Sequence, residues 1–263
     1  MKPSRLSLLV VGAAALAVAV AGCKGQSPDQ GPRPLASVSA AASPAADELP
    51  PGEVLAAAQA KSKAENQKFV FNMSGDRSSM TGKGASDVAN HRASASMEIN
   101  AAGQKLTTET IQIGDELWLR YVGLSTLPKQ WMHVKISQLK ATSLIRKSLE
   151  DPSSMSELLR SAFAVKKSGE RGFEGTVDMT KSPTATPQMV AALGDEAKAV
   201  PFRVTLDDQG RISVMTIDLS RIGKTAGVTT MKAEFFGYGE PVQVQAPAPA
   251  DVVEMPANLI AAL

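Results

Sequence analysis

Ser137 and Lys140 have the spacing at which a serine nucleophile is activated by a lysine base. Penicillin-binding proteins that use such a pair also carry Ser-Asp-Asn and Lys-Thr-Gly motifs. The nearest match here, Lys224-Thr225-Ala226, differs at its last residue. The Gly-x-Ser-x-Gly turn of esterases is absent from the sequence as well. We therefore predict that the protein is not an enzyme, and keep a serine hydrolase built on Ser137 and Lys140 as an alternative.

Residues that could hold a cofactor or a metal ion are equally few. The run Gly223-Lys224-Thr225 would end a phosphate-binding loop, but the earlier glycine that such a loop requires is replaced by Asp218. The chain has one cysteine, and its two histidines, His91 and His133, are 42 positions apart. We predict no metal site and no cofactor.

The charge balance argues against binding to nucleic acid. Lys and Arg number 28 and Asp and Glu 26, and the two surplus cations, Lys2 and Arg5, lie within the first 22 residues. The remainder of the chain is formally neutral, so it lacks the positive surface that attracts phosphates. Aromatic residues make up 4% of the chain, too few for a base-stacking platform.

The N-terminal segment has the pattern of a secretory signal peptide. Lys2 and Arg5 precede an apolar run from Leu6 to Ala21, which is shorter than the roughly 20 residues that span a bilayer. The run ends in Val20-Ala21-Gly22-Cys23, which resembles the lipobox of bacterial lipoproteins, and Cys23 is the only cysteine of the chain. We predict that residues 1–22 are removed and that Cys23 is lipidated.

The predicted acylation determines where the protein acts. Each buried CH₂ group contributes about 0.8 kcal/mol, so two or more acyl chains on Cys23 would anchor the mature protein stably in membrane lipid. The predicted localisation is the cell membrane, with the lipid-anchored protein on the extracytoplasmic face. The alternative for Cys23 is a small buried residue that follows an ordinary signal peptide.

A tether and one domain are predicted after the signal peptide. Residues 23–51 begin with Cys23, and the stretch from Lys24 to Pro51 contains six Pro, six Ala, four Ser and two Gly. Such a composition buries too little apolar surface to offset the entropy of ordering, and its prolines favour extended conformations. Residues 52–263 are numerous enough to bury one sizeable core.

Most of this domain is predicted to be β-sheet. In residues 93–99, for example, Ala93, Ala95, Met97 and Ile99 alternate with polar residues, which is the period of a strand with one buried face. Short polar turns between successive strands favour antiparallel pairing. The predicted strands are 68–73, 93–99, 104–113, 116–121, 131–134, 173–179, 200–206, 211–219 and 229–238.

Helices are predicted in a few blocks, which indicates an α+β domain with helices on one side of the sheet. Residues 53–67 are rich in alanine, and 137–149 form a weaker candidate. A third helix starts at Asp151 and Pro152, with an apolar stripe of Met155, Leu158, Leu159, Ala162 and Phe163. A fourth starts at Thr186-Pro187, with Met189, Val190, Leu193 and Ala197 directed inward.

The order of these motifs resembles the actinobacterial LppX/LprG lipoprotein family, a group of LolA/LolB-like half-barrels. The lipobox and tether precede a helix and a first strand, Lys68 to Ser74, and Met80-Thr-Gly-Lys-Gly84 leads to the second strand. Ile113-Gly-Asp-Glu-Leu-Trp-Leu-Arg120 and Lys129-Gln-Trp-Met-His-Val134 are similar to the family's paired central strands. Gly175-Thr-Val-Asp178 and the segment from Val200 to Ile212 are similar to its later hairpin.

The resemblance implies a curved antiparallel half-barrel whose concave side is covered by helices and encloses an apolar cavity for acyl chains. Apart from Met1 the chain has ten methionines, and flexible, polarizable side chains suit a cavity whose contents vary. The alternative is that these methionines pack an ordinary core. The candidate lining residues are Phe71, Met73, Met97, Leu117, Leu119, Met132, Met179, Val204, Met215, Met231 and Phe235.

Two binding functions follow as hypotheses. The first is a membrane-anchored lipoprotein that binds or carries a lipid or glycolipid by its acyl chains. The second is a surface interaction or sensor module on the same scaffold, with a filled core and no lipid ligand. An opening between the helices and the sheet favours the first, and a closed interior favours the second.

Overall fold

The computed structural model describes residues 49–263, with gaps at 77, 102, 144, 147–148, 150–157, 183–184, 186–189, 192–193 and 223–227. The chain divides into two units, 1–46 and 47–263. All described residues belong to the second unit. The predicted signal peptide, Cys23 and nearly all of the predicted tether lie outside the described residues.

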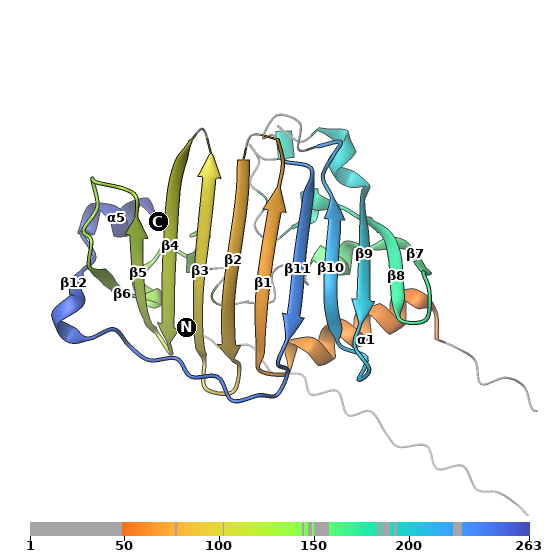
Figure 1. The fold of residues 1–263 in the computed structure, drawn as a ribbon, viewed down its shortest axis with the longest axis horizontal. Helices are drawn as coiled ribbons and strands as arrows, with labels where there is room; N and C mark the ends of the chain where they lie inside the picture. The colour runs from red at the N-terminus through yellow and green to blue at the C-terminus, as the bar shows by residue number, and fades with distance from the viewer. Residues whose placement is uncertain are drawn as a thin grey trace, which may run out of the picture. The chain divides into compact units, whose positions relative to one another are not determined.

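A single sheet of 12 strands forms the body of this unit (Figure 1). The strand order is β12-β6-β5-β4-β3-β2-β1-β11-β10-β9-β8-β7, and every neighbouring pair is antiparallel except β12 and β6, which are parallel. The sheet is open, since β12 and β7 do not pair with each other. The strands are β1 (Gln67–Ser74), β2 (Ser78–Asp87), β3 (Arg92–Ala101), β4 (Gln104–Ile113), β5 (Glu116–Val122), β6 (Trp131–Lys135), β7 (Phe163–Lys167), β8 (Gly172–Val177), β9 (Val200–Leu206), β10 (Ile212–Asp218), β11 (Thr230–Phe236) and β12 (Val252–Glu254).

Alternating side chains give the sheet one apolar and one polar face. In β9, Val200, Phe202, Val204 and Leu206 are buried, whereas the residues between them are exposed. Residues directly opposite in an antiparallel pair point to the same face, so the register carries this alternation from strand to strand. We call the face that bears the buried residues the inner face and the opposite one the outer face.

Helix α1 (Pro51–Lys63) is the one substantial helix of the described residues, and it covers part of the inner face (Figure 1). It begins at a pair of prolines, and it buries Leu55, Ala58, Gln59 and Ser62. The Ser62 hydroxyl donates to the Ala58 carbonyl and accepts a hydrogen bond of 2.8 Å from the backbone amide of Ile212. This contact fixes the end of α1 to the start of β10.

The remaining described helical elements are short. They include the 3₁₀ helices η1 (Ile136–Gln138), η2 (Leu158–Ser161), η3 (Met179–Lys181), η4 (Asp195–Lys198) and η5 (Pro249–Asp251), together with α5 (Ala257–Ala262). The described part of the domain is therefore mostly β, with one open sheet and one substantial helix.

Two separate cores lie on the inner face. The first core joins α1 and η2 to strands β8, β9, β10, β11 and β1, and it includes Leu55, Leu159, Phe202 and Met215. The second core lies on β5 and β6, and it includes Leu117, Met132, Leu139 and Met255. Strands β2, β3 and β4 connect the two cores.

The chain enters the sheet at its centre. β1, the first strand, pairs with β2 on one side and with β11 on the other, and Phe71 lies opposite Gly82 and Ala233. After β11, residues 237–251 run along the edge of the sheet to β12, and the backbone carbonyl of Val244 accepts a hydrogen bond from Arg92 (Figure 1). Both halves of the chain therefore meet at the β1–β11 pair.

Three strands were not predicted from the sequence. β2 contains Gly82 and Gly84 and lacks an apolar alternation, β7 lies at one edge, and β12 is three residues long. The prediction that Met80 to Gly84 only leads to the second strand is wrong, because these residues lie within β2. The other predicted strands agree with β1, β3–β6 and β8–β11 to within two residues at each end.

The predicted helices agree less well. The prediction of a helix through Phe163 is wrong, since η2 ends at Ser161 and Phe163 begins strand β7 with 47% of its surface exposed. Met179 lies in η3, not in the preceding strand. Two predicted helix starts lie outside the described residues. They are Asp151-Pro152, for the helix predicted through Phe163, and Thr186-Pro187, for the following helix.

The contact between β1 and β2 requires a glycine at position 84. A Cβ atom there would lie 2.5 Å from the Phe69 ring and 2.6 Å from the Ser94 carbonyl oxygen. We expect Gly84→Ala to lower the free energy of unfolding by about 1–3 kcal/mol, because the half-buried ring and the backbone must shift.

Gly52→Ala is the matched control, because a Cβ atom at this exposed position of α1 meets nothing within 4 Å and alanine favours helix. Both variants are measured by urea denaturation. Equal stability of Gly84→Ala and the parent protein would contradict the packing of Phe69 over Gly84.

Candidate functional site

The inner face carries almost all of the residues predicted to line a cavity. Direct cross-strand pairs connect Met215 to Ala233, Ala233 to Phe71, and Phe71 through Gly82 to Met97. Met179 alone lies off the sheet, in η3, where it is half-buried and packs against the first core. The ten on the inner face are Phe71, Met73, Met97, Leu117, Leu119, Met132, Val204, Met215, Met231 and Phe235.

These ten residues are divided between the two cores and do not surround one common space. Phe71, Val204, Met215 and Met231 belong to the first core, and Met73 and Phe235 pack against it. The second core contains the remaining buried members, Leu117, Leu119 and Met132. Nine of the ten therefore pack in or against a core.

Met97 is the exception, with 36% of its surface exposed on the inner face of β3. Its neighbours on that face are Gly82 on β2 and Thr108 on β4, followed in the next row by Gly84, Ala95 and Thr110. We call these six residues the central strip. Apart from Met97, this strip carries only glycine, alanine and threonine, and it separates the two cores, which carry larger side chains.

A cavity of about 460 Å³ opens between α1 and the inner face at one end of the first core. Leu49 and Val54 line it on the side of the helix, and Phe173 and Leu206 line it on the side of the sheet. Since Phe173 and Leu206 are members of the first core, the cavity leads from solvent to buried apolar side chains. Its rim is charged and contains Lys167, Glu170, Arg171, Asp207 and Asp208, of which Arg171 pairs with Asp208.

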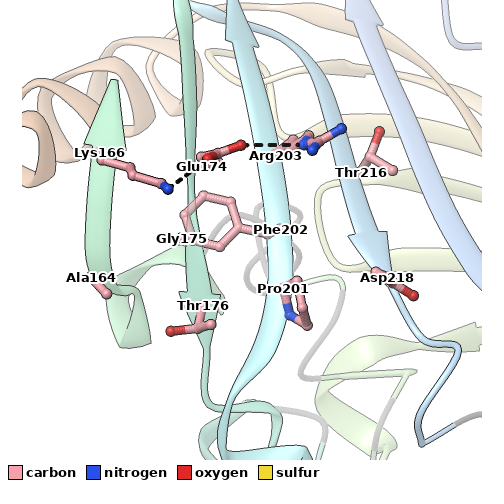
Figure 2. Close-up of a pocket in the computed structure, with 10 residues that line it drawn as sticks. All are labelled: Ala164, Lys166, Glu174, Gly175, Thr176, Pro201, Phe202, Arg203, Thr216 and Asp218. Atoms are coloured by element: carbon pink, nitrogen blue, oxygen red, sulfur yellow. Dashed lines mark ion pairs between the residues drawn. The ribbon is translucent and has the colours of Figure 1, made fainter. Parts of the chain in front are cut away.

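Figure 2 shows a different hollow, of about 510 Å³, on the outer face of β7–β10. The Glu174 carboxylate lies between Lys166, at 3.1 Å, and Arg203, at 3.4 Å. The hydrogen bond and the charge of Lys166, with Arg203, hold the pKa of Glu174 below its ordinary value. Ion pairs across this hollow make it a poor site for an acyl chain.

A second outer hollow, of about 450 Å³, extends over β1–β4 between Phe236 and Trp131. The guanidinium of Arg120 lies 4.5 Å from the centre of the Trp131 ring and forms an ion pair of 2.5 Å with Glu109. Its floor contains Ser94 and Ser96 beside the apolar side chains of Val70 and Ile111. Both outer hollows lie on the face of the sheet opposite the cavity beside α1.

His133 lies on the outer face of β6, between two carboxylates. Its Nε2 is 2.5 Å from Glu116 of β5 and its Nδ1 is 3.0 Å from Glu254 of β12. Partial burial of the ring opposes its charged form, but hydrogen bonds and charge from Glu254 and Glu116 outweigh burial and raise the pKa of His133. The predicted pairing of strands 116–121 and 131–134 indicates Glu116 as a neighbour of His133, whereas no sequence pattern indicates Glu254.

Ser137 and Lys140 each form a hydrogen bond with a different residue. The Ser137 hydroxyl donates a hydrogen bond of 2.6 Å to the Asp115 carboxylate, and the ammonium of Lys140 donates to the backbone carbonyl of Ala261. The bonds from Ser137 lower the pKa of Asp115. These contacts hold η1 against the β4–β5 turn and the C-terminal helix, which is a structural arrangement.

No protein-family model matches the chain, and no curated protein is significantly similar to it in sequence. Within the described part of the chain, no helix is both long and apolar enough to cross a bilayer, and no group of three or more His, Cys, Asp or Glu side chains could hold a metal ion. The fold and its surfaces define a mostly-β protein with one open, largely antiparallel sheet whose inner face is apolar.

Proposed function

We propose that the protein is a membrane-anchored lipoprotein that binds or carries a lipid or glycolipid by its acyl chains. The single observation that carries this proposal is the cavity between α1 and the inner face, because it connects solvent to the apolar side chains of Phe173 and Leu206. The predicted lipobox at Cys23 supports the membrane anchor. The proposed scaffold is a half-barrel similar to the LolA/LolB-like LppX/LprG lipoproteins, with α1 on its concave side.

The proposed mode of binding uses apolar burial and no catalytic group. An acyl chain enters beside Val54 and extends over Phe173 toward the first core, while its polar headgroup stays at the charged rim. The volume of about 460 Å³ lies within the range of about 300–1,000 Å³ that ligand pockets occupy. Burial supplies about 25 cal/mol per Å² of apolar surface, from which the costs of association are subtracted.

Lipid extraction from the full-length protein tests the proposal directly. The protein is purified from membranes, washed in detergent, extracted with organic solvent, and the extract is analysed by mass spectrometry. A lipid in stoichiometric amount, in addition to the predicted acyl groups on Cys23, is the expected result. Protein without co-purified lipid that also takes up no fluorescent fatty acid would contradict it.

Filling the cavity is expected to weaken binding. Val54→Trp places an indole at the cavity wall, and we expect uptake of a fluorescent fatty acid to weaken by about tenfold or more, which corresponds to about 1.4 kcal/mol. Val122→Trp is the matched control, because Val122 is exposed on the outer face of β5. Equal loss in both variants, or unchanged uptake by Val54→Trp, would argue against this site.

The second candidate function is the interaction or sensor module without a lipid ligand. The observation that favours it is the burial of most of the predicted lining residues within two packed cores. Under this function Val54→Trp and the parent protein both fail to bind fatty acid, and no lipid co-purifies with either.

A further inference from the structure

The C-terminal segment 252–263 covers one end of the second core through a small set of contacts. β12 pairs with β6 over only three residues, the Met255 amide donates a hydrogen bond of 2.8 Å to the His133 carbonyl, and the Lys140 ammonium donates one to the Ala261 carbonyl. Val253, Met255 and the α5 residues Leu259 and Ile260 pack on the core. Figure 1 shows this segment at the end of the sheet, beyond the long connection from β11. Few contacts at an edge strand make its local opening inexpensive in free energy.

The side-chain contact between Glu254 of β12 and His133 of β6 depends on the protonation of His133. Carboxylates only accept hydrogen bonds, so a ring with a carboxylate at each nitrogen must donate from both nitrogens. His133 has Glu116 at Nε2 and Glu254 at Nδ1. Only the imidazolium form satisfies both, because a neutral imidazole has one N–H donor.

The two contacts are not equivalent, and the weaker one belongs to β12. The distance to Glu116 is 2.5 Å, and the second oxygen of Glu116 lies 3.8 Å from Lys135. Glu254 is 3.0 Å from the ring and has a side chain that is 84% exposed. A neutral His133 therefore keeps its proton on Nε2 toward Glu116 and turns a lone pair toward the Glu254 carboxylate.

Neither Trp118 nor Lys135 replaces the Nδ1–H group of His133 as a donor to Glu254. Trp118 of β5 lies 5.3 Å from His133 and carries no charge. Lys135, on β6 itself, is directed to Glu116. The charged groups that face His133 are thus Glu116 from β5 and Glu254 from β12, with Lys135 acting through Glu116.

We propose that residues 252–263 form a lid over the second core that is held closed by protonated His133 and released when His133 loses its proton. The lid exposes Met132 and its neighbours on the inner face when β12 leaves β6. This inference does not depend on lipid binding, since it concerns the attachment of the chain's own C-terminal segment.

The direction of the pH dependence follows from the raised pKa of His133. A group whose pKa is higher in the closed state stabilises that state below its ordinary pKa. The stabilisation is lost as the pH rises through the raised value. The lid is therefore closed under mildly acidic conditions and opens toward alkaline pH.

Hydrogen–deuterium exchange of the full-length protein tests the lid. After correction for the intrinsic pH dependence of exchange, we expect protection of peptides from 252–263 to fall about tenfold between pH 5.5 and pH 8.5, as the loss of one charge-assisted hydrogen bond predicts. Protection of β1 and β2, far from the lid, should stay constant. Unchanged protection of 252–263 over this range overturns the proposal.

Two variants separate the lid from a general effect of pH. Glu254→Gln should abolish the pH dependence, because a carboxamide can accept from the charged ring or donate to the neutral one, and its exposed position makes misfolding no concern. His91→Asn is the matched control at an exposed histidine in the β2–β3 turn, and it should keep the tenfold change. A tenfold change that persists in Glu254→Gln overturns the proposal.

Discussion

Cys23→Ser is expected to abolish the membrane-bound mature form that we propose for this protein. A serine hydroxyl cannot carry the thioether-linked lipid, so processing at Gly22-Cys23 should stop. Each buried CH₂ of the missing acyl chains contributes about 0.8 kcal/mol, and the remainder of the chain is formally neutral, so no net positive charge attracts it to anionic lipid. We expect an uncleaved precursor held by its apolar run, or protein released after cleavage elsewhere.

The measurement is intact-mass spectrometry of the membrane and soluble fractions. The matched control is Ser37→Ala, a small substitution in the predicted tether, which should leave processing and fractionation unchanged. Membranes that retain Cys23→Ser protein at the normal mature mass would show that the anchor is not the lipid on Cys23.

Leu117→Ala is expected to have the largest effect on stability. Leu117 is 0% exposed at the centre of the second core, where it lies opposite Val134. Truncation of a buried leucine leaves a cavity and costs about 2–5 kcal/mol. Because α5 and β12 also pack on this core, its loss should also lower protection of residues 252–263.

Val122→Ala on the same strand is the control. Val122 is 53% exposed on the outer face, so we expect a change within about 0.5 kcal/mol. Urea denaturation of Leu117→Ala, Val122→Ala and the parent protein measures the three free energies of unfolding. A similar loss in both variants would mean that the inner face of β5 is not the buried one.

The period-two pattern was sufficient to predict most of the sheet and its faces. Alternation identifies which side chains share a face, so Met97, Met132 and Met215 could be placed on one side before their strand neighbours were known. β2 was missed because Gly82 and Gly84 have no side chains to alternate. Gly84 is required by the Phe69 ring of β1 and the Ser94 carbonyl of β3, and Gly82 lies close to the Met97 side chain of β3.

Which members of the apolar face are buried could not be derived from local pattern. Burial depends on α1 and on the C-terminal segment, which come from opposite ends of the domain. The apolar stripe of Leu158, Leu159 and Phe163 suggested a helix. The first two are buried in a single 3₁₀ turn, and the chain then enters β7. The partners of His133 were also not found, because β12 is too short to show a strand pattern.

The β1–β11 pair has a consequence for the order in which this protein can fold. β1 is the first strand to emerge from any machinery that delivers the chain from its N-terminus, yet one of its two neighbours, β11, lies more than 150 residues later. Closing so long a loop is slow, because its entropic cost precedes the contacts that offset it. Until β11 arrives, Phe71 and Met73 remain on an unpaired strand edge, the kind of surface on which aggregation begins. One edge of β1 therefore stays unpaired until β11 pairs with it, so this edge is exposed longer than the edge that β2 covers.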